Sequence, residues 1–78
     1  YLIVDAHTDS VGSDESNKLL SENRASEVKK YLVQRGVNEN RIIARGWGES
    51  RLLIQNDVTE EDKAKNRRTE FILTRVID

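Results

Sequence analysis

The spacing of apolar residues predicts a strand, a loop and a long helix in the first half of the chain. Residues 1–6 form a short apolar and β-branched run, which is typical of a strand. A polar loop over residues 7–14 follows. Apolar residues then recur at steps of three and four over residues 14–35, which predicts a helix with one apolar stripe that ends at Gly36. The stripe consists of Leu20, Ala25, Val28, Tyr31 and Leu32.

The second half of the chain predicts shorter elements. They are a strand over residues 42–44, a turn over 46–49, an irregular loop over 50–58, a short polar helix over 59–65 and a last strand over 69–77. Thr59, followed three residues later by Asp62, is the capping signal that starts the short helix. The order strand–helix–strand–short helix–strand indicates an α/β (α+β) two-layer sandwich that contains a βαβ unit and has a thin core.

Length and charge restrict the class of protein. With 78 residues the chain is long enough for one small domain, which we expect to span residues 1–78. Thirteen Lys and Arg against fourteen Asp and Glu give a net charge of −1, which argues against nucleic acid as a partner. No apolar run is long enough for membrane insertion, and the absence of cysteine excludes disulfides and thiolate zinc sites.

The chain opens inside a strand-like run and not with Met. We therefore expect it to be an N-terminally truncated piece of a longer protein. Three strands and one long helix make a sheet with only one face covered. The strand that should open such an α/β sandwich is missing, together with any helix beside it. Truncation or pairing with a second copy, as a homodimer, would both explain that gap.

Asp9 and Arg24 are the first candidates for a binding site. Asp9 lies just past the first predicted strand, and Arg24 follows fifteen residues later inside the helix. One interpretation is structural, a salt bridge or a helix-capping carboxylate. The other is a site for a small zwitterion, in which Asp9 takes an ammonium and Arg24 takes a carboxylate through its planar guanidinium. Both interpretations can hold, because a ligand can displace an internal pair.

Other polar residues near this pair have structural and functional interpretations. Thr8 and Asn17 either hydrogen-bond the same ligand or serve as turn and cap residues. For His7, a loop imidazole bonded to the backbone is favoured over a metal ligand or a general base, because the chain has a single His and no Cys. One of Arg67 and Arg68 can serve the site while the other faces solvent or pairs with Glu70. We expect no catalytic residues, no metal and no cofactor.

Several separated motifs, in the same order, resemble the OmpA-like (OmpA/MotB C-terminal) domain over nearly the whole chain. The motifs are His7-Thr8-Asp9-X-X-Gly12, Asn17-X-X-Leu20-Ser21-X-X-Arg24-Ala25, Gly36-Val37, Gly46-X-Gly48-Glu49 and Asn66-Arg67-Arg68-X-Glu70-Phe71. The resemblance implies a βαβαββ sandwich of which the first strand and helix are absent here. The chain departs from the family pattern at Ala6, Ser16 and Asp62-Lys63.

The resemblance also implies a function. Domains of this family bind cell-wall peptidoglycan non-covalently in the periplasm and anchor outer-membrane or other envelope proteins. It implies that Asp9 and Arg24 clamp the diaminopimelate of the stem peptide, and that Thr8, Asn17 and Arg67 line or support the pocket. On this reading the protein is not an enzyme. The alternative is a self-associating structural or assembly module with little affinity for peptidoglycan.

Overall fold

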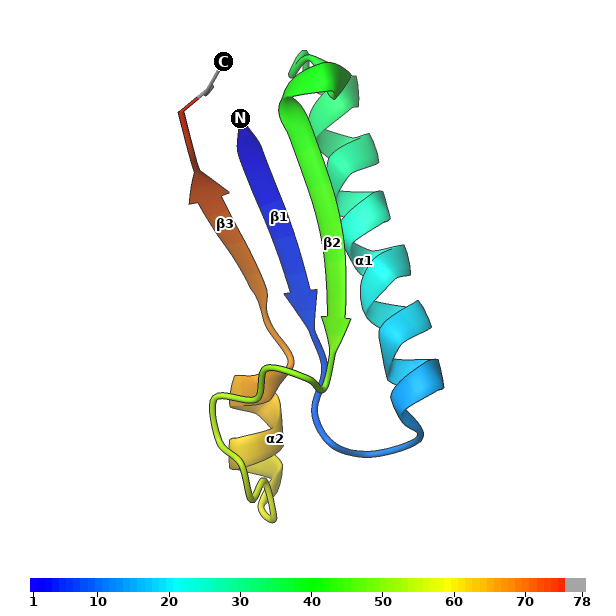
Figure 1. Cartoon of the computed structure of the whole chain (residues 1–78), viewed down its shortest axis with the longest axis vertical. Helices are drawn as coiled ribbons and strands as arrows, with labels where there is room; N and C mark the ends of the chain where they lie inside the picture. Colours follow the sequence, from blue (N-terminus) through cyan, green and yellow to red (C-terminus); the bar gives the residue numbers. More distant parts are fainter. Residues whose placement is uncertain (76–78) are drawn as a thin grey trace.

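The computed structural model describes residues 1–75, which form a three-stranded sheet with a long helix on one face and a short helix at one end (Figure 1). The elements in chain order are β1 (Leu2–His7), α1 (Asp14–Gln34), a 3₁₀ turn (Glu39–Arg41), β2 (Ile42–Gly48), α2 (Glu60–Asn66) and β3 (Thr69–Leu73). This order and the two layers confirm the predicted fold class. The end of the strand expected over residues 69–77 lies outside the described residues.

The sheet has the strand order β2-β1-β3. β1 runs parallel to β2, with Leu2 opposite Ile42, as expected for a βαβ unit. β3 runs antiparallel to β1, with Val4 opposite Phe71. The carboxyl ends of β1 and β2 and the start of β3 therefore meet at one end of the sheet, where the loop after β1 and helix α2 also lie (Figure 1).

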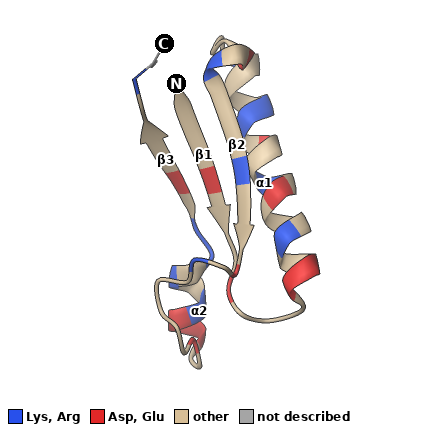
Figure 2. Ribbon diagram, viewed as in Figure 1, with Lys and Arg blue, Asp and Glu red and all other residues tan. Residues whose placement is uncertain are grey.

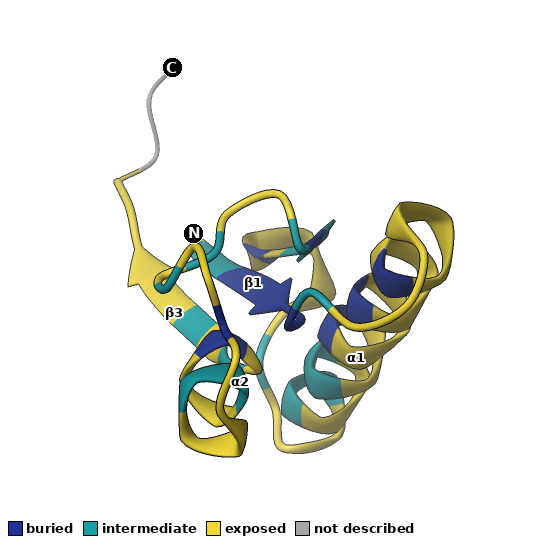
Figure 3. Ribbon diagram, turned by 90° about the horizontal axis from the view of Figure 1, so that it is seen from below, coloured by how far each residue is buried: buried dark blue, intermediate teal, exposed yellow. Residues whose placement is uncertain are grey.

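The hydrophobic core lies between α1 and the face of the sheet formed by β1 and β2. Its buried apolar residues are Val4, Ala6, Ala25 and Ile42, with partly buried side chains such as Val28 and Leu32 around them. In the end-on view α1 lies beside the buried part of β1, whereas β3 is largely exposed (Figure 3). The core is thin, as the composition and length predicted. No helix in residues 1–75 is long and apolar enough to cross a membrane.

The sequence prediction for β2 was too short. We expected a strand over 42–44 and a turn over 46–49, but β2 continues to Gly48. The physical reason is the close approach of α1, because a Cβ on Gly46 would lie 2.2 Å from the backbone nitrogen of Glu22. The glycine at this position therefore allows the helix to pack on the strand, and it does not mark a turn.

The helix boundaries follow local signals. The Ser13 hydroxyl accepts a hydrogen bond from the Ser16 amide at 3.1 Å, and the Thr59 hydroxyl accepts one from the Asp62 amide at the same distance. Gly36, directly after α1 and its C-cap, has a φ of 99°, in the left-handed region. These contacts confirm the predicted start of α2 and the predicted end of α1.

Each strand of the sheet carries a charged residue at the same level, because Asp5 of β1 lies opposite Arg45 of β2 and Glu70 of β3 (Figure 2). Since Val4 and Ala6 face the helix, their neighbour Asp5 points to the opposite face. Asp5 accepts two hydrogen bonds from Arg45, at 2.7 and 2.8 Å, and this guanidinium lowers the pKa of Asp5. The sheet is therefore amphipathic, with its apolar face under α1.

Candidate functional site

Asp9 lies in the loop after β1, where it forms an ion pair with Arg67. Its Oδ2 is 3.0 Å from Nη1 of Arg67, which lies between α2 and β3. Its Oδ1 accepts a hydrogen bond from the Val11 amide, also at 3.0 Å. Asp9 is only 8% exposed, so the carboxylate is held in one place by the loop and by Arg67.

Arg67 binds two carboxylates at once. Besides Asp9 it contacts Glu60, in the first turn of α2, through Nη2. The hydrogen bond with Glu60 is the largest cause of the raised pKa of Arg67, and the bond with Asp9 adds to it. One guanidinium between two carboxylates leaves one net negative charge, which favours the approach of a cation.

Arg24 is exposed on α1 and is not paired with Asp9. Among residues 1–75 it forms no ion pair and no side-chain hydrogen bond. The salt-bridge interpretation of Asp9 and Arg24 is therefore wrong for this structure. α1 begins at Asp14, and a rise of about 1.5 Å per residue places the backbone of Arg24 roughly 15 Å along the helix from that residue. Because none of residues 1–75 pairs with it, Arg24 presents a free guanidinium at that point of the helix.

Thr8 and Asn17 are buried and hold the loop that carries Asp9. The Thr8 hydroxyl donates to the carbonyl of Asp9 at 3.0 Å. The side-chain amide of Asn17 lies within 3.3 Å of three oxygens, namely the carbonyls of Asp9 and Val11 and a carboxylate oxygen of Glu49. These contacts match the turn-and-cap interpretation, and the ligand contacts of the two residues remain a prediction.

The two consecutive arginines before β3 diverge as the sequence suggested. Arg67 reaches the Asp9 loop, whereas the Nε of Arg68 donates to Oε2 of Glu70 at 2.6 Å. One arginine thus belongs to the candidate site and the other is bound on the charged face of the sheet.

His7 differs from the prediction. It was expected in the loop with its ring bonded to the backbone, but it is the last residue of β1 and only 2% exposed. Within the part of the chain that the structure describes, neither ring nitrogen has a hydrogen-bond partner. Nε2 lies 3.8 Å from Oε1 of Glu70. Burial is the largest cause of its lowered pKa, so the fold favours the neutral imidazole.

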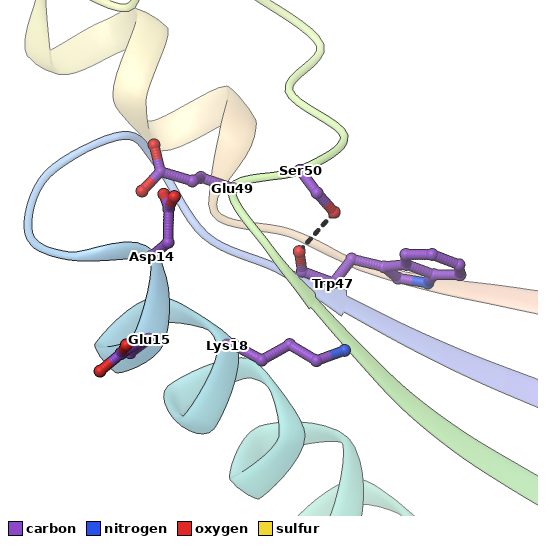
Figure 4. A pocket seen from close by; sticks show the side chains of 6 residues that line it. All are labelled: Asp14, Glu15, Lys18, Trp47, Glu49 and Ser50. Carbon is purple, nitrogen blue, oxygen red and sulfur yellow. Dashed lines mark hydrogen bonds between the residues drawn. The ribbon is translucent and has the colours of Figure 1, made fainter.

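A groove of about 670 Å³ lies beside the start of α1 (Figure 4). It is lined by Asp14, Glu15, Lys18, Trp47, Glu49 and Ser50. The side chains of Asp14 and Glu49 point toward one another, and the Asp14 carboxylate raises the pKa of Glu49 (Figure 4). The indole of Trp47 points away from them and has the guanidinium of Arg51 3.5 Å from its ring centre. Glu49 also bonds to Asn17, which connects this groove to the Asp9 loop.

Sequence reasoning missed one residue that contacts the same loop. Asp57, in the segment between β2 and α2, accepts hydrogen bonds from the amide and the hydroxyl of Ser10. The two residues are 47 positions apart. Asp57 lies in an irregular segment without any motif, so only the folded chain reveals this contact.

Comparisons with known proteins agree with this architecture. A family model described as the OmpA family matches residues 1–67. The chain is 51% identical over 67 residues to outer membrane porin F of Pseudomonas fluorescens, covering 86% of this chain and 20% of the porin. The peptidoglycan-associated lipoprotein from Burkholderia pseudomallei has a TM-score of 0.86 at 26% identity, over 92% of this chain and 60% of that one. The C-terminal domain of Helicobacter pylori MotB also has a TM-score of 0.86, at 32% identity, over 97% of this chain and 58% of that one.

Proposed function

The chain belongs to the OmpA family, and we propose that it binds cell-wall peptidoglycan non-covalently, without catalysis, through the diaminopimelate of the stem peptide. In this proposal the domain works in the periplasm and anchors an outer-membrane or other envelope protein to the cell wall. The observation that carries the proposal is the likeness in fold, over nearly the whole chain, to a peptidoglycan-associated lipoprotein.

The distribution of charge at the site supports a zwitterionic ligand. The carboxylates of Asp9 and Glu60 outnumber the single guanidinium of Arg67 between them, so this end of the site attracts an ammonium group. Arg24 offers a guanidinium that no carboxylate in residues 1–75 occupies, so it can take a carboxylate with two parallel hydrogen bonds. Diaminopimelate carries both groups at one end of its side chain.

The rigidity of the loop supports a binding role for Asp9. Its carboxylate is fixed by Val11 and Arg67, and its carbonyl by Thr8 and Asn17. A ligand that meets a fixed group loses less conformational freedom on binding. Arg67 in this proposal keeps Asp9 in place and shares it with the ligand ammonium.

We expect Arg24→Ala and Asp9→Ala to weaken binding strongly. Removal of one partner of a desolvated charge pair costs roughly 2–5 kcal/mol, which is at least about a thirtyfold loss of affinity. The measurement is co-sedimentation with purified sacculi, together with titration by free diaminopimelate. Arg24 is exposed, so the Arg24→Ala protein should fold like the wild type.

Arg41→Ala is the matched control. Arg41 is another exposed arginine, but it precedes β2 and lies at the end of the sheet away from the Asp9 loop. We expect it to bind as the wild type does. An Arg24→Ala protein that still sediments fully with sacculi, or a folded wild type that does not bind them, would contradict the proposal.

A second candidate function is a self-associating assembly module. It is favoured by the exposure of apolar side chains on β3, where Phe71 is 59% and Leu73 is 85% exposed. On this reading a folded wild type fails to bind sacculi and forms oligomers.

A further inference from the structure

We propose that Asp57, together with Asn66, is a positioning residue that fixes both halves of the Asp9–Arg67 ion pair. The inference rests on the proposed function, because it assigns a role at the same binding site. Asp57 and Asn66 do not touch the ligand in this proposal. They act through their neighbours in the chain and in space.

Asp57 holds the Asp9 loop. Its Oδ2 accepts a hydrogen bond from the Ser10 amide at 3.0 Å, and its Oδ1 is bound by the Ser10 hydroxyl. Ser10 directly follows Asp9, so these two bonds fix the backbone on one side of the site carboxylate. The Ser10 bonds are also the largest cause of the lowered pKa of Asp57, which keeps it ionised.

Asn66 holds the segment that carries Arg67. It is completely buried and directly precedes Arg67. Its Oδ1 accepts hydrogen bonds from the amides of Leu53 and Ile54, at 2.8 and 3.0 Å. Its Nδ2 donates to the Ile54 carbonyl at 3.0 Å and to Oδ2 of Asp57 at 3.1 Å. Each polar atom of this side chain is therefore bonded.

The Asp57–Asn66 bond joins the two halves. It links the residue before Arg67 to the residue after Asp9, through a contact that is itself buried. The segments that carry Asp9 and Arg67 are thus joined twice: by the ion pair itself, and by the hydrogen bonds of Asp57 to the neighbouring residues Ser10 and Asn66. Buried hydrogen bonds of this kind keep a binding group within a fraction of an ångström of its place, and their loss weakens binding without removing a ligand contact.

The test compares Asp57→Ala with Asp57→Asn. Alanine removes the three bonds, whereas asparagine keeps the oxygen that accepts from Ser10 and Asn66 and places an amide next to the Ser10 hydroxyl. We expect Asp57→Ala to bind diaminopimelate about tenfold more weakly, the lower end of the loss that follows when a group that orients a metal ligand is removed. We expect Asp57→Asn to restore most of the affinity. Affinity is measured well below the unfolding temperature, so that a loss of stability alone does not change it.

The control is Asp5→Ala. It also removes a buried carboxylate with two side-chain bonds, but these go to Arg45 on the charged face of the sheet. It should lower stability and leave the affinity of the folded protein unchanged. Equal binding by Asp57→Ala and the wild type would overturn the positioning role while the proposed function stands.

A second measurement does not depend on the ligand. The side-chain NMR signals of Arg67 should shift toward those of a free arginine in Asp57→Ala and stay in place in Asp57→Asn and Asp5→Ala. Failure of the wild type to bind diaminopimelate or sacculi would refute the proposed function, and these signals would still decide the positioning role. Unchanged Arg67 signals in Asp57→Ala would overturn it.

Discussion

The imidazole of His7 is held at the end of β1 in surroundings that oppose its protonation. Charged groups near it come from several elements: Asp5 on β1, Glu70 on β3, Arg68 before β3 and Arg51 after β2. The carboxylates favour the imidazolium, but burial and the two arginines outweigh them and lower the pKa of His7. The folded state therefore favours the neutral imidazole over the imidazolium.

We expect His7 to make folding stability depend on pH. As the pH falls below about 6.5, the unfolded chain binds a proton at His7 before the folded protein does. The free energy of unfolding should then fall with decreasing pH, by at most ~1.4 kcal/mol per pH unit from this residue. Urea unfolding of the wild type and His7→Phe between pH 7.5 and 5.5 measures this effect. Parallel pH dependence of the two proteins would contradict it.

The packing of α1 on β2 depends on backbone contact at Gly46. The helix backbone at Ser21 and Glu22 lies where a Cβ on Gly46 would be, and the Ser21 hydroxyl accepts a hydrogen bond from the Gly48 amide at 2.8 Å. The same helix carries Asn17, which holds the Asp9 loop. The distance between helix and strand thus also sets the position of the loop.

We expect Gly46→Ala to destabilise the protein by about 3 kcal/mol or more, at the upper end of the cost of overpacking. The added carbon would meet backbone atoms, which cannot rotate away. Gly36→Ala is the matched control, because its site has open space and only the positive φ is strained, at a cost of about 1–2 kcal/mol. Urea unfolding compares the two variants, and equal losses would show that close approach at Gly46 is not important.

At the scale of the whole molecule, the sheet is covered unevenly. Phe71 lies opposite Val4 and Leu73 opposite Leu2, so both side chains are on the same face of the sheet as α1. The helix covers that face at β1 and β2. α1 does not bury them, and Tyr31 on the helix is also 54% exposed. β3 is an edge strand of the sheet in the described structure. Apolar side chains beside a free edge favour association with another chain.

We therefore expect this chain to self-associate as its concentration rises. Phe71→Thr with Leu73→Thr should shift the population toward monomer, whereas Val58→Thr, at an exposed apolar residue of the loop before α2, should not. Light scattering over a range of concentrations measures the change. A wild type that is folded and monomeric at high concentration would refute this expectation.

How much the sequence could predict depended on the range of the interaction. The Thr59 cap, the Gly36 end of α1 and the separation of Arg67 from Arg68 are local, and all three were found from neighbouring residues. Gly46 was misinterpreted, because a glycine at a turn and a glycine under a helix have the same local signal. The sequence suggests a backbone partner for the ring of His7, and none of residues 1–75 provides one.

The sequence alone determined the order of the elements, the two-layer class and the family, because each depends on periodicity and on motifs that local spacing preserves. Only the tertiary structure decided which charges meet. Asp9 pairs with Arg67, 58 positions away, and no residue in the described part of the chain pairs with Arg24. Asp57 joins that pair from a segment without a motif. Contacts between distant positions depend on how the strands and the helix pack in space, and the spacing of residues along the chain does not predict that packing.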